Sequence, residues 1–530
     1  MVASGGRAVT SPCQVLVVGA GPTGLTLALS AHDHGALVRV VERREEAFRP
    51  SRALIVHPRT LEVLRPLGVT DALLARADTA PVGALHLGAH VVEERLADLE
   101  LPDTPFPHLT LVRQMDVEEV LGAALAERGV QVERGTQLLT ARAGAGQAGV
   151  ELRSPHGVEK TACGFVAGCD GQDSTVRADA GIGWRGGPYA EEVVLADVEF
   201  EGGLGAETRG SDGTHVVAGR HGLVFLFPLG ELATWRMLAT RRAPLGPSPE
   251  FGQSGPPVET ADLEGLLRGA GFGARIASVA WSAQVPLQHR LAPAFRRGRL
   301  FLAGDAAHAY SPATGQGMNA GIQDAANLGW KLAFASATVG TTPDDLSRLL
   351  GSYDAERRPV AFRRLLLTHA AFWGEASTAP LPSWLRGTAA PVAAPAVPLL
   401  LHRRRLVAEA IRTVSQLRVH YRDSPLSVES TPGPEGPWRA GDRLPDLDVT
   451  VGGSPTRLHA LVAAPGMHLL VHPDAVGVSL SGLGPRVTVH RLEHAPGHGL
   501  TVVRPDGYVG FRGTGADQTG LRAWLSLAAT

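Results

Sequence analysis

Three glycines and one acidic residue near the N-terminus have the spacing of a dinucleotide-binding turn. Gly19, Gly21 and Gly24 follow the apolar run 14–18, and Glu42 ends a second apolar run. Glycines at these positions permit a tight turn, close approach of the backbone to a pyrophosphate, and close packing of the following helix on a sheet. The start of that helix offers unbonded N–H groups to phosphate, and the Glu42 carboxylate can bind ribose hydroxyls. The pattern predicts a dinucleotide site, which NAD and FAD would fit equally.

A second candidate site lies in the second half of the chain. Asp305 follows the apolar run 299–303, and the loop Gly315–Asn319 leads into a helix predicted over 319–335. A carboxylate at the end of a strand can accept hydrogen bonds from a polyol chain, and the positive end of the helix can face an anionic group. Asp305 can also simply cap a turn, and the residues alone leave that alternative open.

The elements that would position these two sites indicate an α/β fold with an inserted domain. Apolar runs typical of buried parallel strands alternate with helices in the regions that carry the two sites, whereas short alternating strands and Gly/Pro turns dominate between them. Such a change of pattern is typical of an antiparallel sheet inserted into a parallel one. The predicted segments are 1–192 and 286–375 for the first domain, 193–285 for the inserted sheet, 376–430 for a linker with helices, and 431–530 for a small C-terminal α/β domain.

The composition limits the possible functions. Of the 530 residues, 44% are hydrophobic and 19% are charged, and the formal net charge of -2 lacks the basic excess of a typical nucleic-acid binder. The cysteines Cys13, Cys163 and Cys169 show neither a CxxC pair nor the spacing of a metal site, which favours a reducing compartment and no metal. The sequence shows no signal peptide and no apolar stretch long enough to span a membrane. We therefore expect a cytoplasmic protein without nucleic-acid or membrane partners.

Further motifs connect both candidate sites to one known family. They are Cys169-Asp170-Gly171 with Ser174 and Arg177, and Gly304-Asp305 with Asp324, Asn327 and Trp330-Lys331. With the glycine turn, they make the stretch from about residue 15 to residue 371 resemble the group A flavoprotein monooxygenases, the para-hydroxybenzoate-hydroxylase-like aromatic hydroxylases. Within that family, the chain is most similar to actinomycete enzymes that tailor aromatic polyketides or inactivate polyketide-type antibiotics. The resemblance implies a Rossmann-like FAD-binding domain with an inserted antiparallel β-sheet that covers the substrate.

The resemblance also implies roles for individual residues. Glu42, with Arg43 beside it, would bind the adenosine ribose of FAD. Gln114 and Asp305 would lie along the ribityl chain, and Asp170 would serve the binding of both FAD and NAD(P)H. The implied cofactor-binding residues are Gly19, Gly21, Pro22, Thr23, Gly24, Glu42, Arg43, Arg52, Gln114, Asp170, Asp305, Pro312, Gly315, Gly317, Met318 and Asn319.

The implied reaction is hydroxylation of an aromatic ring. NAD(P)H reduces FAD, dioxygen forms a C4a-hydroperoxide, and its distal oxygen is transferred to an electron-rich, phenol-type ring of a polycyclic, polyketide-type substrate. Arg52 is the candidate for a catalytic role, with a purely structural role at the pyrophosphate as its alternative. Phe225 and Phe227 lie on a predicted strand and are candidates for the substrate pocket, although core packing explains them equally well. No motif marks a base that deprotonates the substrate, and His308 beside the flavin loop is more typical of a packed or capping histidine.

Other functions are compatible with parts of the same pattern. Baeyer–Villiger oxygen insertion or oxidative ring rearrangement would use the same scaffold and would differ in the product. A non-catalytic flavin-binding scaffold is a further alternative, against which the intact glycine loop Gly315–Asn319 argues. A plain NAD dehydrogenase is another, but it does not explain the Gly304–Asn319 block. The segment from about 441 to 508 resembles the thioredoxin-like domain appended to some phenol-hydroxylase relatives. Because it contains no cysteine, we expect a structural or dimerisation module, in a monomer or a homodimer.

Overall fold

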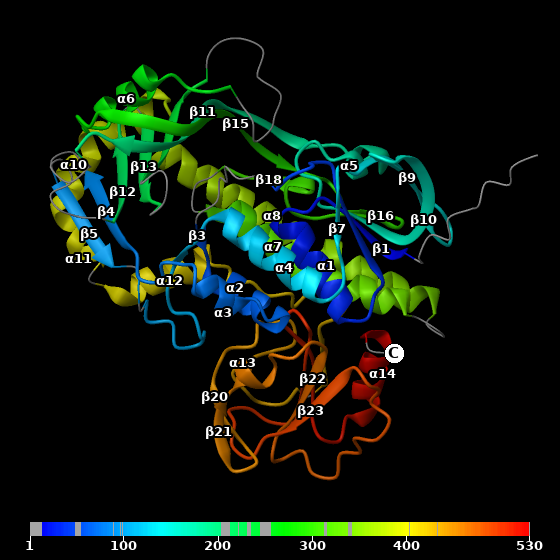
Figure 1. Ribbon diagram of the computed structural model, residues 1–530. Helices are drawn as coiled ribbons and strands as arrows, with labels where there is room; N and C mark the ends of the chain where they lie inside the picture. Colours follow the sequence, from blue (N-terminus) through cyan, green and yellow to red (C-terminus); the bar gives the residue numbers. More distant parts are fainter. Residues whose placement is uncertain are drawn as a thin grey trace, which may run out of the picture.

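The computed structural model contains two large sheets, a smaller C-terminal sheet, and helices that join and cover them (Figure 1). Two residues assigned above to the active site, Arg52 and Pro312, lie outside the described part of the chain. The described residues are 13–47, 55–87, 90–95, 97, 99–202, 213–220, 222–229, 235–243, 256–311, 315–337, 342–401, 403–431 and 433–528.

The first sheet joins the start of the chain to a segment from beyond its middle. β1 (Cys13–Val18) lies between β2 (Val38–Glu42) and β10 (Gly157–Gly168), and β10 also pairs with β17 (Leu300–Leu302); all these pairs are parallel. β17 is fully buried, as expected of a parallel strand that is covered on both faces. Through β17, the chain therefore returns to this sheet. The other strands of the sheet are β7 (Val132–Arg134), β8 (Gln137–Ala143), β9 (Ala148–Ser154) and β16 (Arg296–Arg297).

Two helices that begin at the candidate sites pack closely beside this sheet. They are α1 (Pro22–Asp33) and α7 (Gln316–Ser336). A Cβ atom at Gly329 of α7 would lie only 2.6 Å from the Cβ atom of Ser30 in α1, so that the helix backbones approach unusually closely. The glycine turn and the loop before α7 thus start two neighbouring helices. The other helices of this domain are α2 (Pro58–Leu64), α3 (Thr70–Leu74), α4 (Gln114–Glu127) and α5 (Thr175–Asp179), with short 3-10 turns at Arg65–Leu67 and Gly304–Ala306.

The second sheet reaches further along the sequence than the predicted inserted domain. β4 (Val82–Leu87) pairs in parallel with β12 (Thr214–Gly219), and this pair adds a segment that the sequence analysis placed in the first domain. β11 (Arg185–Phe200) and β15 (Ile276–Leu291) are long strands that connect the two domains (Figure 1). Such long-range pairing depends on tertiary contacts, which local alternation does not reveal. The sheet is completed by β5 (His90–Arg95), β13 (Gly222–Pro228), β14 (Trp235–Arg242) and β18 (His308–Ala309), and α6 (Thr260–Gly269) belongs to the same region; β3 (Ile55–Val56) and β6 (Thr110–Leu111) form a separate pair.

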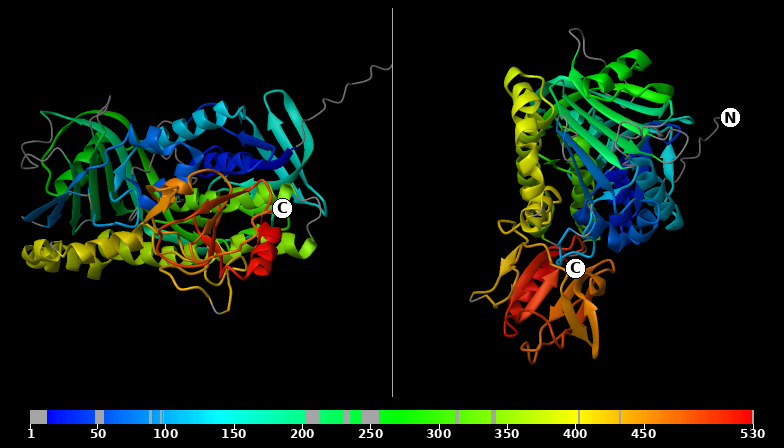
Figure 2. Two further views of the ribbon diagram at one scale, coloured as in Figure 1. Left: turned by 90° about the horizontal axis from the view of Figure 1, so that it is seen from below. Right: turned by 90° about the vertical axis from the view of Figure 1, so that its left-hand side faces the viewer.

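One long helix runs along the molecule and ends beside the second sheet. This helix is α8 (Pro343–Glu375), and Figure 2 shows it extending past both large sheets. The Pro/Ala-rich stretch that follows forms short helices, because prolines in the first turn of a helix cost no backbone hydrogen bond. These helices are α9 (Pro380–Trp384), α10 (Ala390–Ala393), α11 (Val397–Leu401) and α12 (Arg404–Val414), with a π turn at Leu385–Ala389 and a 3-10 turn at Ala394–Ala396. Within the described residues, no helix combines the length and the apolar composition needed to cross a membrane.

The C-terminal domain contains a five-stranded sheet in the order β19-β25-β24-β22-β23. β22 pairs in parallel with β23 and antiparallel with β24, and β24 pairs antiparallel with β25, which is a thioredoxin-like arrangement. The residues 472–486 that join β22 to β23 form turns without a helix. The elements are β19 (Val428–Glu429), β20 (Asp448–Val451), β21 (Ser454–Arg457), α13 (Leu458–Leu461), β22 (Met467–Val471), β23 (Val487–Arg491), β24 (Leu500–Val503), β25 (Val509–Gly513) and α14 (Gln518–Ala528).

Candidate active site

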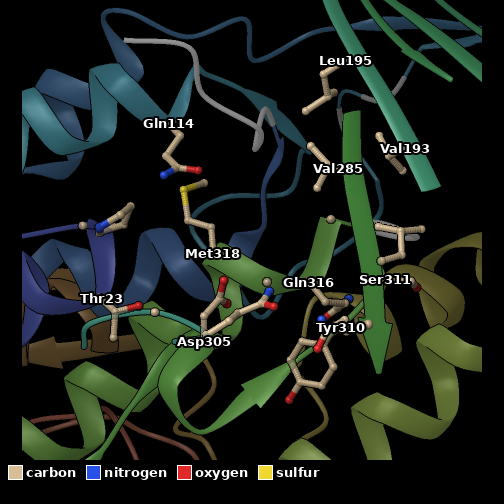
Figure 3. Close-up of a pocket in the computed structure, with 18 of the residues that line it drawn as sticks. Thr23, Gln114, Val193, Leu195, Val285, Asp305, Tyr310, Ser311, Gln316 and Met318 are labelled. Atoms are coloured by element: carbon tan, nitrogen blue, oxygen red, sulfur yellow. The ribbon is translucent and has the colours of Figure 1, made fainter. Parts of the chain in front are cut away.

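One large cavity, with a volume of about 850 Å³, is lined by residues from both large sheets. Gly19 and Glu42 from the first candidate site and Asp305 and Met318 from the second line the same cavity. Figure 3 shows Thr23, Gln114, Asp305 and Met318 on one side of it and Val193, Leu195 and Val285 of the second sheet on the other. Two segments far apart in the sequence therefore converge on one space. We call the first side the cofactor end and the second side the substrate end.

Thr23 is the contact that brings the two segments together. Its hydroxyl lies 2.6 Å from the position that a Cβ atom would take at Gly304, and it would also contact a Cβ atom at Gly321 of α7. A larger residue at either glycine would push α1 away from the Asp305 loop. The motif around Gly19 and the motif around Asp305 are thus held in direct contact by one side chain and two glycines.

Two helix N-termini open toward the cofactor end. α1 begins after Gly21 and α7 begins after Gly315, and neither helix has a side-chain cap. Among the described residues, a Cβ atom at Gly21 or at Gly317 would meet no atom of a non-neighbouring residue within 4 Å. The first N–H groups of a helix need a partner and carry a partial positive charge. Both helices therefore offer anion-binding ends to the same space.

Two carboxylates at the cofactor end are held in place by hydrogen bonds of ordinary length. The Glu42 carboxylate accepts bonds from the backbone N–H groups of Ala20 at 2.9 Å and Arg44 at 3.0 Å. The Gln114 amide donates to Glu118 at 2.8 Å, and both residues line the cavity. Burial raises the pKa of Glu118. These contacts fix the orientation of the Glu42 and Glu118 side chains within the protein.

Several buried oxygen atoms at the cavity wall have no hydrogen-bond partner in the described structure. They are Oδ1 of Asp170, Oε1 of Gln172 and Oε1 of Gln316. The other oxygen of Asp170 accepts bonds from the N–H groups of Thr175 at 2.8 Å and Val176 at 3.3 Å, and burial raises the pKa of Asp170. Buried polar atoms in native proteins are nearly always paired. Acceptors left unpaired at the wall of a cavity indicate that a ligand or water completes them.

Hydrogen bonds to Asp324 of α7 hold the loop that carries Asp305. The Asp324 carboxylate accepts bonds from the N–H of Gly304 at 3.1 Å, from His308 at 2.5 Å and from Arg357 at 2.6 Å. Burial alone would raise the pKa of Asp324, but Arg357 and His308 hold it below its ordinary value. His308 is fully buried and does not line the cavity, so its contacts position the Asp305 loop.

Most of the described residues in the cofactor assignment line the cavity, and two do not. Gly24 packs against the carbonyl of Gly19, where a side chain would clash. The Asn319 amide accepts from the His57 N–H at 2.9 Å and donates to the Ile55 carbonyl at 2.8 Å, so it holds the chain before α2 and does not face the cavity. Those that line it are Gly19, Gly21, Pro22, Thr23, Glu42, Arg43, Gln114, Asp170, Asp305, Gly315, Gly317 and Met318.

The substrate end is mainly an apolar wall of the second sheet. Phe225 and Phe227 both line it, and their rings stack with a centroid distance of 5.5 Å and an angle of 12°. They lie two residues apart on β13 and therefore share one face. Other wall residues on the strands of this sheet could have been predicted in the same way, because every second side chain of a strand lies on the same face. The residues that the sequence analysis missed include Val193, Leu195, Val216, Leu223, Leu238, Val285, Leu287, Tyr310, Ser311, Glu375 and Arg386.

Comparison with protein families decides which class of enzyme has this site. A family model described as "FAD binding domain" matches residues 12–366, and one described as "Aromatic-ring hydroxylase, C-terminal" matches residues 438–528. The chain belongs to the FAD-dependent aromatic-ring hydroxylases. It is an FAD-dependent monooxygenase, and the resemblance inferred from the sequence motifs is confirmed.

Relatives and solved structures of this hydroxylase family match almost the whole chain. The 6-methylpretetramide 4-monooxygenase of Streptomyces rimosus is 33% identical over 97% of this chain and 93% of its own length. The structure of OxyS anhydrotetracycline hydroxylase from Streptomyces rimosus matches with a TM-score of 0.76 and 29% identity, covering 97% of this chain and 99% of that one. The Diels-Alderase PyrE3 of pyrroindomycin biosynthesis matches with a TM-score of 0.73 and 27% identity, covering 97% of this chain and 99% of that one.

The cofactor end of this hydroxylase fits FAD. The uncapped start of α1 suits a pyrophosphate, and the uncapped start of α7 suits the electron-rich edge of a flavin ring. The unpaired oxygens of Asp170 and Gln316 offer acceptors for the hydroxyl or N–H donors of such a ligand. FAD and NAD(P)H are the cofactors of the enzyme. One continuous cavity therefore contains helix ends suited to phosphate, unpaired hydrogen-bond acceptors and the apolar wall of the substrate end.

Proposed function

We propose that this protein hydroxylates a polycyclic phenol of the aromatic polyketide type. The observation that carries the proposal is the continuity of the cavity, which leads from the glycine turn at Gly19 to the stacked pair Phe225 and Phe227 without an intervening wall. A flat, fused-ring molecule matches an apolar wall with stacked aromatic rings, because aromatic side chains favour offset stacking. The substrates named for the tetracycline-type relatives belong to the same chemical class.

We assign roles at the cofactor end on the basis of position and chemistry. The start of α1 at Gly21 would hold the pyrophosphate, Glu42 the adenosine ribose, and Asp305 the ribityl hydroxyls. The start of α7, from Gly315, would stabilise negative charge on the flavin ring. When bound, FAD supplies the transfer of electrons from NAD(P)H to dioxygen. The roles of Arg52 and Pro312, which lie outside the described residues, stay predictions.

The substrate end would orient the ring and keep out water. Each turnover consumes one NAD(P)H, one proton and one dioxygen; one oxygen atom replaces a ring hydrogen as a hydroxyl group, and the other leaves as water. Side chains such as Leu195, Val285 and Phe227 offer no hydrogen bonds to water, which favours productive transfer over loss of hydrogen peroxide. The chain would thus contribute placement and exclusion of water.

The product separates this proposal from its alternatives. Baeyer–Villiger insertion or ring rearrangement would use the same cavity and give a lactone or a changed ring skeleton. A reaction without oxygen transfer is a further alternative, because a neighbour of the same fold is named a Diels-Alderase, and a fold alone does not dictate the chemistry.

The test is substrate-stimulated flavin reduction followed by product analysis. The FAD-loaded enzyme is mixed without oxygen with NADH or NADPH and a panel of polycyclic phenols, and the loss of flavin absorbance is timed. The phenol that accelerates reduction is then supplied with ¹⁸O₂. We expect one labelled hydroxyl per product molecule by mass spectrometry, and the ring hydrocarbon without its hydroxyl serves as the matched control. Absence of label, or a lactone product, would overturn hydroxylation.

A further inference from the structure

Glu375 places a carboxyl group at the otherwise mainly apolar substrate end. It is the last residue of α8 and lines the cavity, as do Phe225 and Arg386. The backbone around it is fixed, because the Arg386 guanidinium donates to the carbonyls of Gly374 at 3.0 Å and Ser377 at 2.5 Å. The carboxyl group therefore projects from a rigid support.

The charged groups around this position are engaged elsewhere. Arg386 also donates to the carbonyl of Gly219 at 2.9 Å, and Arg236 of β14 forms a two-fold contact with Asp197 at 2.7 Å. The carboxylate of Glu191 on β11 accepts bonds from the segment that follows α8, including the Thr378 N–H at 2.7 Å. Among the described residues, no side chain forms a hydrogen bond or an ion pair with the Glu375 carboxylate.

The position of Glu375 is unfavourable for folding alone. Burial raises the pKa of Glu375. The C-terminal end of a helix carries partial negative charge, which further disfavours a carboxylate there. A residue that violates local preference on the wall of a cavity is more readily explained by function than by stability.

We propose that Glu375 is the catalytic base that accepts the proton of the substrate's phenolic hydroxyl. The inference rests on the proposed hydroxylation of a phenol in this cavity. The substrate O–H bond breaks and an O–H bond to the Glu375 carboxylate forms, while the electron pair stays on the substrate oxygen. The negative charge on the substrate oxygen raises the electron density at the ring carbons ortho and para to that oxygen. These carbons then react more readily with an electrophilic oxygen atom. The carboxyl group later returns the proton to water, so the base is restored.

The electrostatics suit this task. A general base works best when its pKa lies near that of the group it deprotonates and near the working pH. Burial shifts Glu375 in that direction, whereas a nearby arginine would shift it the other way. The apolar wall around it strengthens a hydrogen bond between carboxylate and phenol relative to the same bond in water.

The experiment uses FAD-loaded enzyme and the polycyclic phenol that accelerates flavin reduction in the screen proposed above. Glu375→Gln keeps the shape and removes the base, Glu375→Asp keeps a carboxyl group, and Glu127→Gln is the matched control at the solvent-exposed end of α4. The absorbance of the bound phenol reports its ionisation as the pH is varied. The rate of product formation and the thermal stability are measured on the same samples.

We expect Glu375→Gln to raise the pH at which the bound phenol ionises and to lower the hydroxylation rate about 100-fold, the lower range of general-base effects. Glu375→Asp should recover part of the rate, and Glu127→Gln should match the unaltered enzyme. The Gln variant should be at least as stable as the unaltered enzyme, which a purely structural role would not produce.

These measurements distinguish the function of the enzyme from the role of Glu375. If the unaltered enzyme oxygenates no phenol, the proposed function is overturned and the inference on Glu375 falls with it. If the unaltered enzyme is active but Glu375→Gln has the same rate and the same phenol ionisation, the base assignment alone is overturned. A lower rate in Glu375→Gln with unchanged ionisation and reduced stability would also overturn it, because the residue would then be structural.

Discussion

α7 contacts two buried polar regions that differ in how many of their polar atoms have hydrogen-bond partners. At its N-terminal end lies the cofactor end of the cavity, where Asp170 and Gln316 each have a buried oxygen that no described residue bonds. Further along α7 lies an interface with the C-terminal domain, formed by Asn327, Lys331, Glu356, Arg504 and Asp506, which we call the hairpin-tip interface. Arg504 and Asp506 lie in the turn between β24 and β25.

At the hairpin-tip interface, both carboxylates are fully bonded. Glu356 accepts bonds from Arg504 at 2.7 and 2.8 Å and from Lys331 at 2.8 Å. Asp506 accepts bonds from Arg504 at 3.0 Å and from Asn327 at 2.9 Å. A saturated network needs no ligand, whereas the unpaired oxygens in the cavity do. The difference separates groups that hold domains together from groups that await a ligand, although both are buried and polar.

The largest expected effect comes from breaking the hairpin-tip interface. Arg504→Met removes the main partner of Glu356 and leaves that carboxylate buried, which typically costs about 3–5 kcal/mol. Denaturant unfolding should show this loss, and Arg491→Met on the exposed face of β23 is the matched control. If both variants unfold at the same denaturant concentration, the hairpin-tip interface does not stabilise the protein. The proposed difference between this interface and the cavity would then be wrong.

A second interface with the C-terminal domain, formed by α2, and the cavity should respond to acid with opposite signs. At the interface of α2 with the C-terminal domain, Glu62 has burial to overcome, but Arg443 and His459 lower its pKa to about 2. Its stabilising contribution is present above its ordinary pKa of 4.5 and is lost as the pH falls toward 2. In the cavity, burial raises the pKa of Asp170 and Glu118, so their unfavourable charge is relieved as the pH falls.

Calorimetry of the FAD-free protein between pH 7 and pH 3 tests this sign difference, with limited proteolysis to locate the first segment to open. Each unit of pKa shift corresponds to about 1.4 kcal/mol. His468 and His472, whose pKa values burial lowers to about 4, add to the acid sensitivity of the C-terminal domain below pH 6.5. We expect that domain to open first. Glu62→Gln should flatten the stability slope below pH 4.5; an unchanged slope would contradict the assignment.

Substitution of a residue at the cofactor end of the cavity should weaken the binding of FAD. Asp305→Ala removes a charged acceptor from the cofactor end, and bonds to charged groups are worth about 1.5–3 kcal/mol. FAD affinity should therefore fall roughly 10- to 100-fold. Fluorescence titration with FAD measures the affinity, and Asp344→Ala on the exposed start of α8 is the control. Unchanged occupancy would remove Asp305 from the proposed site.

The smallest expected effect lies at the substrate end. Phe225→Leu removes one ring of the stacked pair but keeps an apolar surface, and an aromatic pair is worth about 0.5–1.5 kcal/mol beyond the area it buries. The KM for the polycyclic phenol should rise roughly 2- to 10-fold with little change in FAD affinity. Phe362→Leu on the exposed side of α8 is the control. A fall in FAD affinity equal to that of Asp305→Ala would mean that the two ends are not distinct.

Features that lie within one short segment followed directly from the sequence. The strand, glycine turn, helix and acidic residue around Gly19 and Glu42 form one unit, so their spacing predicts their geometry. The common face of Phe225 and Phe227 also followed, because side chains alternate along any strand. In each case, the residues that define the feature are neighbours in the chain, and backbone geometry relates them.

Features that need several elements were decided only by the tertiary structure. Asn319 stands at a motif position, yet its amide binds the chain near Ile55 and His57, because α7 packs on that segment. Glu375 carries no motif and reaches the cavity only because a helix of 33 residues ends there. Local propensity and spacing therefore determined the cofactor turn and the strand faces, whereas long-range packing decided which oxygens remain unpaired and which side chains line the substrate end.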